Sequence, residues 1–187
     1  MAEFWDEASF VLDVMARKIE PYDEDGLDLT FTEGSVEVSH SRNKKWFFRK
    51  REFEEAMNRS RPNTNRKMIS PTNMPYALNR IFEEYITNAE DDVKSGRLKK
   101  FTLIILTDGK WSLQGQQLID VRTQIQQFMT LCNRIWGPLL KHVERKANCQ
   151  RPVSIQFVQF GDDLDARLRL RYLDNELPFE EEFRDIG

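Results

Sequence analysis

Apolar positions along this chain repeat with two periods, one typical of helices and the other of strands. Apolar residues at helical spacing predict helices over residues 3–19, 73–94 and 164–175. Near-continuous apolar runs at 101–107 and 153–160 predict two strands that are buried on both faces. The pattern therefore predicts a mixture of helices and buried strands.

Weaker patterns complete the prediction of secondary structure. Apolar and polar residues alternate over 27–32, which predicts a strand, and Glu33-Gly34 separates it from a second short strand at 35–39 that we expect to be antiparallel to it. Residues 114–146 form a long helical stretch, which we expect to be broken near Gly137-Pro138 because proline cannot continue the helical hydrogen bonds.

Residues 41–71 form a polar, basic segment between these elements. It holds ten lysines and arginines, and its aromatic residues predict a short helix over 45–58 that packs on the body of the protein. Glu52, Glu54 and Glu55 interrupt the positive charge. We interpret the segment as a solvated insertion in a loop-rich part of the chain.

Strands that alternate with helices imply a parallel sheet covered by helices. We expect an α/β fold of the Rossmann-like, doubly wound kind, with a mostly parallel sheet, helices on both faces and one antiparallel edge strand. The length of 187 residues favours one domain over residues 1–187, with the basic insertion at about 41–71.

The overall composition narrows the class of protein. A net charge of −3 gives no sign of a nucleic-acid or membrane partner, and no apolar run is long enough to cross a bilayer. The acidic amino terminus lacks the apolar core of a secretory signal, so we expect an intracellular, cytoplasmic protein. Cys132 and Cys149 stand alone, which argues against a zinc site and against a disulfide framework.

Several segments, in order, resemble a von Willebrand factor type A (vWA) domain. They are the strand after an acidic turn, Asp25-Gly26-Leu27-Asp28-Leu29, the helix start at 71–78, the strand end Leu106-Thr107-Asp108-Gly109 and the later stretch at 157–163. The resemblance covers nearly the whole chain, although each motif is short. It implies the doubly wound fold with a metal-ion-dependent adhesion site at the carboxyl edge of the sheet.

By position, the resemblance makes Thr72 and Asp108 candidate metal ligands. Thr72 matches the threonine of the family's second loop, and Asp108 matches the aspartate of its third loop. A hydroxyl and a carboxylate suit Mg²⁺, which takes six oxygen ligands and keeps waters when protein ligands are few. Each residue also has a simpler interpretation, since threonine is a favoured N-cap and an aspartate before glycine is common in turns.

The chain departs from the family at its beginning. The Asp-x-Ser-x-Ser loop is absent from the sequence, and the chain starts at what would be the helix after the family's first strand. We interpret the domain as amino-terminally incomplete, with a degenerate metal site. The family's first strand lies in the middle of the sheet, so its absence leaves backbone groups of the neighbouring strands without hydrogen-bond partners. Either the chain is an incomplete form, or the flanking strands close up, or another molecule donates a strand.

Function is therefore expected to be binding rather than catalysis. The sequence lacks a glycine-flanked nucleophile and a phosphate-binding loop, which argues against an enzyme. The main hypothesis is a protein-interaction module that docks a protein partner near Thr72, Asp108 and the loop 109–115. The alternatives are a nucleic-acid or phosphate binder that uses the basic 42–67 segment, including Arg49, Lys50 and Arg51, and a degenerate domain with a structural role only.

Overall fold

A computed structural model provides the structure of the protein. It describes residues 1–22, 27–32, 37–38, 46–62, 73–95, 99–111, 115–143 and 153–176. The chain divides into two compact units, Met1–Asn73 and Met74–Gly187. The expectation of one domain over residues 1–187 stays a prediction.

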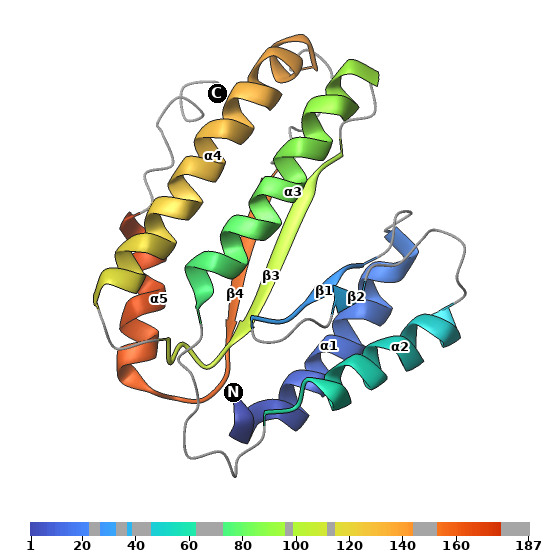
Figure 1. The fold of residues 1–187 in the computed structure, drawn as a ribbon, viewed down its shortest axis with the longest axis vertical. Helices are drawn as coiled ribbons and strands as arrows, with labels where there is room; N and C mark the ends of the chain where they lie inside the picture. Colours follow the sequence, from blue (N-terminus) through green and yellow to red (C-terminus); the bar gives the residue numbers. More distant parts are fainter. Residues whose placement is uncertain are drawn as a thin grey trace. The chain divides into compact units, whose positions relative to one another are not determined.

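The amino-terminal unit consists of two helices and a pair of very short strands (Figure 1). The 3₁₀ turn η1 (Ala2–Phe4) leads into α1 (Trp5–Ile19), which η2 (Glu20–Tyr22) follows; strands β1 (Leu29–Thr30) and β2 (Glu37–Val38) precede α2 (Trp46–Arg59). Helix α1 packs against α2 through Trp5, whose Nε1 donates to the carbonyl oxygen of Met57 at 3.1 Å. The Trp5 ring also stacks on Phe31, with the ring centroids 6.1 Å apart.

The carboxyl-terminal unit is a parallel strand pair with its connecting helices. Its order is α3 (Met74–Ser95), β3 (Phe101–Thr107), α4 (Gly115–Val143), β4 (Val153–Gln159) and α5 (Leu164–Glu176). Strands β3 and β4 pair in parallel over their full lengths, from Phe101 opposite Val153 to Thr107 opposite Gln159. Parallel strands require a crossover connection, and α4 provides it.

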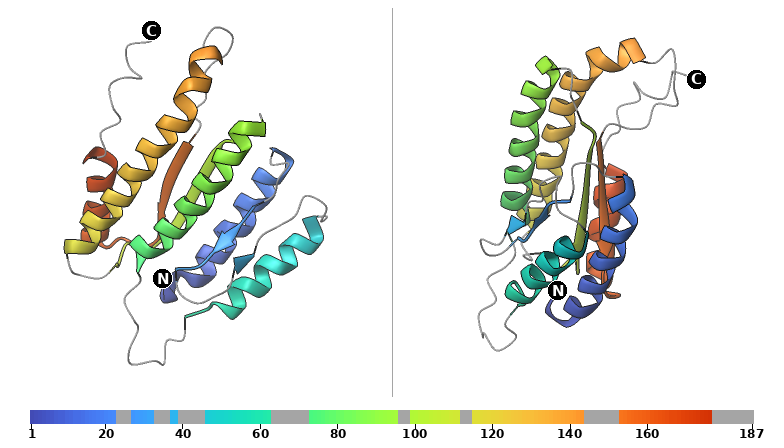
Figure 2. Two further views of the ribbon diagram at one scale, coloured as in Figure 1. Left: turned by 45° about the horizontal axis from the view of Figure 1, so that its top comes forward. Right: turned by 90° about the vertical axis from the view of Figure 1, so that its right-hand side faces the viewer.

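Helices α3 and α4 lie side by side on one side of the strand pair, and α5 lies on the other side (Figure 2). The main core forms between the strands and the first two helices. Phe128 of α4 stacks on Phe82 of α3 with centroids 4.0 Å apart, and the edge of Phe101 from β3 meets the same ring at 5.3 Å. The alternate strand residues that begin with Phe101 and Val153 face this core.

Most of the predicted elements are present with nearly the expected bounds. The structure confirms both main strands and four predicted helices to within a residue or two, with a 3₁₀ turn at the start of α1. These helices are the ones predicted at 3–19, 45–58, 73–94 and 164–175. The strands expected at 27–32 and 35–39 are antiparallel as predicted, but the described pairing spans two residues on each. None of the described helices combines the length and the apolar character that a membrane crossing requires.

Two predictions were wrong. Strands β3 and β4 are not buried on both faces, because Thr102 and Gln156, on the face turned away from the main core, are exposed. Helix α4 is not broken near Gly137-Pro138 but continues to Val143 with Pro138 inside it. Two residues before the proline, Trp136 donates from Nε1 to the Tyr85 hydroxyl of α3 at 3.0 Å, which ties this part of α4 to the neighbouring helix.

The coarse fold class is confirmed as mixed α/β with a small parallel sheet. Two two-stranded sheets, β1–β2 and β3–β4, account for the strand pairing in the described residues. The finer expectation, a full doubly wound sheet, stays a prediction.

We predict that replacing Phe128 with alanine destabilises the protein strongly. Phe128 is 2% exposed and contacts three other aromatic rings, so its removal leaves a cavity that costs about 3–5 kcal/mol in the free energy of unfolding. Urea denaturation monitored by circular dichroism measures the change. Gln127→Ala, at the neighbouring exposed position, is the control and should change stability by less than about 0.5 kcal/mol. Equal effects of the two substitutions would contradict the core as described.

Candidate functional site

The candidate site lies where β3 and β4 both end. Because the strands are parallel and in register, the segment 107–111 after β3 and the segment 160–163 after β4 meet at one edge. The backbone N–H of Phe160 donates to the carbonyl oxygen of Thr107 at 2.8 Å, which extends the pairing to the last strand residue. In open α/β folds, the carboxyl edge of parallel strands is the place where ligands bind.

Asp108 is the first residue beyond β3, and it forms a tight turn. Its Oδ1 accepts a hydrogen bond from the backbone N–H of Lys110 at 3.1 Å, an Asx turn of the kind that aspartate favours. Gly109 adopts a φ of +69°, a left-handed conformation that costs glycine little. The Asp108 residue as a whole is 9% exposed, so this turn holds a carboxylate largely out of solvent.

The hydroxyl of Thr107 organises the same turn from inside. Thr107 Oγ1 accepts hydrogen bonds from the Gly109 backbone N–H at 2.9 Å and from Trp111 Nε1 at 3.0 Å. Thr107 and Trp111 are 3% and 4% exposed, and the Trp111 ring lies 6.0 Å from that of Phe157 on β4. A buried indole N–H needs an acceptor, so this contact fixes both the side chain and the path of the loop.

Helix α5 clamps the turn from the other side. A Cβ atom added at Gly109 would lie 2.5 Å from the Cβ of Ala166, which is closer than two such atoms can approach. Arg169, one turn further along α5, donates from Nη1 to the Gly109 carbonyl oxygen at 2.8 Å. The turn is therefore held by a steric contact and by a charge-assisted hydrogen bond from one helix.

Asp163 caps the amino terminus of α5 and adds a second carboxylate to the edge. Its Oδ1 accepts from the Ala166 backbone N–H at 2.9 Å, and this hydrogen bond is the main reason why the pKa of Asp163 is lowered. The Lys110 ammonium, 4.0 Å from Asp163 Oδ2, lowers that pKa further. Both side chains are partly exposed, so the ion pair itself contributes little to stability.

The structure describes one of the two predicted metal ligands. Asp108 lies at the carboxyl edge of β3, as expected, whereas Thr72 lies outside the described residues. Asp108 already accepts the Lys110 N–H, and Lys110 and Arg169 place positive charge beside the turn. Within the part of the chain that the structure describes, no three His, Cys, Asp or Glu residues form a group that could hold a metal ion.

Several residues that shape the site were not singled out from the sequence. Thr107 and Trp111 lie at the end of β3, and Ala166 and Arg169 lie on α5, so the fold brings two separate segments together. Asp163 stands just before the helix predicted at 164–175, and this position is the ordinary sequence signal of an N-cap. For Arg169 the sequence holds no comparable signal, because it is one of several arginines on a charged helix.

We predict that Gly109→Ala destabilises the protein, whereas Gly137→Ala does not. Alanine at 109 combines a positive φ with the contact to Ala166, so we expect a loss of about 1–3 kcal/mol in the free energy of unfolding. Gly137 lies in α4 with nothing within 4 Å of an added Cβ, and alanine there should stabilise by up to about 1 kcal/mol. Thermal unfolding measures both changes, and a neutral Gly109→Ala would contradict the clamp.

We also predict that Asp163 makes stability depend on pH in the acid range. The pKa of Asp163 is lower in the folded protein than its ordinary value of 3.8, so its contribution is present above pH 3.8 and is lost as the pH falls below it. In Asp163→Asn this contribution disappears, because an amide does not titrate. Urea denaturation at a series of pH values from 6 to 2 compares the two proteins. Parallel curves would rule out the contribution.

No protein-family model matches this chain, and neither a curated protein nor a solved structure matches it. The resemblance to the vWA family is carried by the four segments quoted above, and membership of that family stays a proposal.

Proposed function

We propose that this chain is a protein-interaction module of the vWA type, which binds a protein partner at the carboxyl edge of β3 and β4 and does not act as an enzyme. The observation that carries the proposal is the position of Asp108: a carboxylate held in a clamped turn at the edge where open α/β folds bind ligands. In this proposal the β3–β4 pair is part of a doubly wound sheet.

The rigidity of the turn supports a binding role. Thr107, Ala166 and Arg169 fix the backbone on both sides of Asp108, so this loop is already ordered before a partner binds. A preorganised surface loses less conformational entropy on association than a flexible one. The Asp108 carboxylate, at the margin of this edge, and the more exposed Lys110 place both signs of charge here, which favours a partner with a complementary charged pair.

A magnesium ion is the cofactor that the family resemblance implies. Asp108 would supply one carboxylate ligand, and Thr72 is the second candidate. We propose a direct contact with the partner, made by the Asp108 carboxylate itself, and the magnesium titration described below distinguishes it from a metal-mediated one. A degenerate adhesion site of this kind binds a basic rather than an acidic group of the partner.

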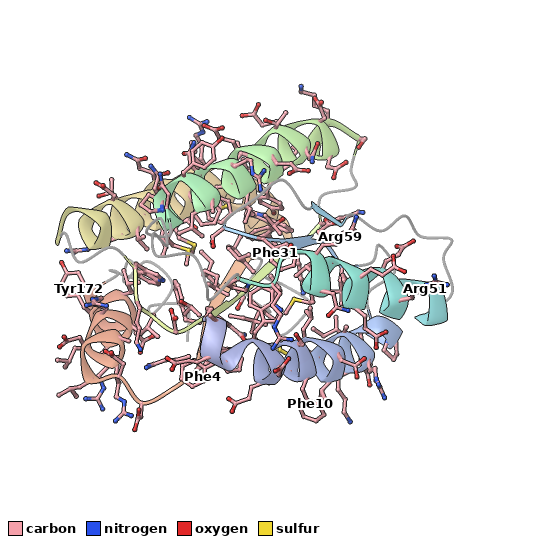
Figure 3. All side chains as sticks on the ribbon, turned by 60° about the horizontal axis from the view of Figure 1, so that its bottom comes forward. Phe4, Phe10, Phe31, Arg51, Arg59 and Tyr172 are labelled. Atoms are coloured by element: carbon pink, nitrogen blue, oxygen red, sulfur yellow. The ribbon has the colours of Figure 1, made fainter. Side chains whose placement is uncertain are left out.

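The described contacts of the basic segment do not favour nucleic acid as the ligand. Arg51 pairs with Glu55 at 2.8 Å, and Arg61 pairs with Asp6 at 2.8 Å. Arg59 donates from Nε to the carbonyl oxygen of Glu55 at 3.3 Å. These guanidinium groups are engaged with oxygens of the protein, and a phosphate would have to compete with them. Figure 3 labels Arg51 and Arg59 on α2.

We predict that Asp108→Asn reduces capture of the protein partner by roughly tenfold or more. Asparagine keeps the Oδ1 acceptor for the Lys110 N–H, so the turn is retained while the charge is lost. Quantitative affinity capture with the tagged full chain measures bound partner, and calorimetric titration with MgCl₂ is run on the same proteins. Heat of magnesium binding that vanishes in Asp108→Asn would replace the direct contact by a metal-mediated one.

Asp162→Asn is the matched control, because Asp162 is an exposed carboxylate at the same edge. It should leave capture unchanged. Identical partners for wild type and Asp108→Asn would overturn the assignment of the site. If both substitutions change only the stability of the chain, the result would instead support the alternative hypothesis of a purely structural role.

A further inference from the structure

Helix α5 exposes a pair of leucines on the side opposite its buried residues. Leu164 and Leu168 are one helical turn apart and are 65% and 52% exposed. On the other side of the helix, Ala166 and Leu173 are almost completely buried. Large apolar side chains on successive turns form a continuous apolar surface, which marks a contact more strongly than a single exposed leucine does.

Two arginines border the leucine pair. Arg167 and Arg171 are exposed and also lie one turn apart. Within the described part of the chain, neither guanidinium group forms an ion pair or a hydrogen bond, whereas Arg169 is bound to the Gly109 carbonyl oxygen. Residues three and four positions apart share one face of a helix, so the two arginines and the two leucines form one surface. A segment that combines apolar and acidic residues fits this surface.

The chain continues from α5 into a segment of this composition. The tail, residues 177–187, lies outside the described residues, and its sequence is Leu-Pro-Phe-Glu-Glu-Glu-Phe-Arg-Asp-Ile-Gly. Phe179, Phe183 and Ile186 recur at helical spacing, which predicts an apolar face, and four acidic residues stand against one arginine. Pro178 cannot continue α5 but suits the first turn of a new helix.

We propose that the tail folds back along α5 as a short antiparallel helix and covers Leu168. At about 1.5 Å per residue, Leu168 lies about 12 Å along α5 from Glu176, and a helix from Pro178 to Ile186 is also about 12 Å long. Ile186 therefore reaches the level of Leu168. A connection this short joins neighbouring antiparallel helices, so the occupant is the tail of the same chain rather than the tail of a second copy.

Charge favours the same arrangement. In the predicted tail helix, Glu182 borders the apolar face on one side. When two helices pack antiparallel, that side meets the side of α5 that carries Arg167 and Arg171, whereas in a parallel pair it meets the opposite side. The two arginines therefore gain a close acidic neighbour in the fold-back arrangement. The proposal does not depend on the proposed function, since it concerns the outer face of α5 and not the carboxyl edge of the strands.

The test is hydrogen exchange of the tail amides in the full chain, measured by mass spectrometry on the peptic fragment that contains the tail. A synthetic peptide of residues 177–187 gives the exchange rate without docking. The tail of the wild-type chain should exchange about tenfold or more slowly than this peptide, at a rate that does not change with protein concentration. Leu168→Asp should return the rate to that of the peptide, because it places a carboxylate in the apolar contact.

Leu164→Asp is the matched control, on the same face of the same helix. Leu164 lies about 18 Å along α5 from Glu176, beyond the end of the tail helix, so the protection should remain. A wild-type tail that exchanges like the free peptide overturns the proposal, and so do equal effects of the two substitutions. Protection that grows with protein concentration overturns it as well, because the occupant would then be the tail of a second copy.

A charge reversal tests the antiparallel arrangement and leaves the apolar contact intact. Arg171→Glu should speed exchange of the tail about threefold, because Glu182 then meets a like charge, and adding Glu182→Arg should restore the protection. Arg134→Glu makes the same change of charge at an exposed position on α4 and should leave the exchange of the tail unchanged. A double variant that exchanges as fast as Arg171→Glu alone overturns the antiparallel arrangement.

Discussion

The parallel pairing of β3 with β4 is the constraint on which the carboxyl-terminal unit depends. Seven residues of each strand face one another without a shift, and the Phe160 N–H continues the ladder to the Thr107 carbonyl oxygen. This register brings the turn at Asp108 to the same edge as the start of α5. A shift by one residue would turn Phe101 and Val153 away from the core and would separate Gly109 from Ala166.

The turn after β3 is over-determined by its neighbours, and that gives the Asp108 carboxylate a fixed place. Position 109 requires glycine because its φ is positive and because Ala166 approaches too closely for a Cβ atom. Arg169 donates a hydrogen bond to the carbonyl oxygen of the same residue. Thr107 and Trp111 hold the turn from the core side. Such a loop is suited to recognition, because the free energy of folding has already ordered it before any partner arrives.

By itself, the sequence determined the elements and their order. Periodicity gave α3 and α5 to within a residue or two, and the apolar run 101–107 gave β3 with its bounds, because local hydrophobic patterns reflect which face of an element is buried. The pattern failed at Pro138, because α4 continues through the proline to Val143. The pattern also overestimated the burial of Thr102 and Gln156, because an apolar stretch of sequence does not determine whether one or both faces of a strand are covered.

The tertiary structure alone decided what surrounds Asp108. The Thr-Asp-Gly run marked the strand end as a candidate, but the residues that hold it, Ala166 and Arg169, lie more than fifty positions further along the chain. Their proximity follows from the β3–β4 register and the path of α5, neither of which leaves a local trace in the sequence. Long-range contacts of this kind arise from packing, and packing is a property of the folded chain rather than of any one of its segments.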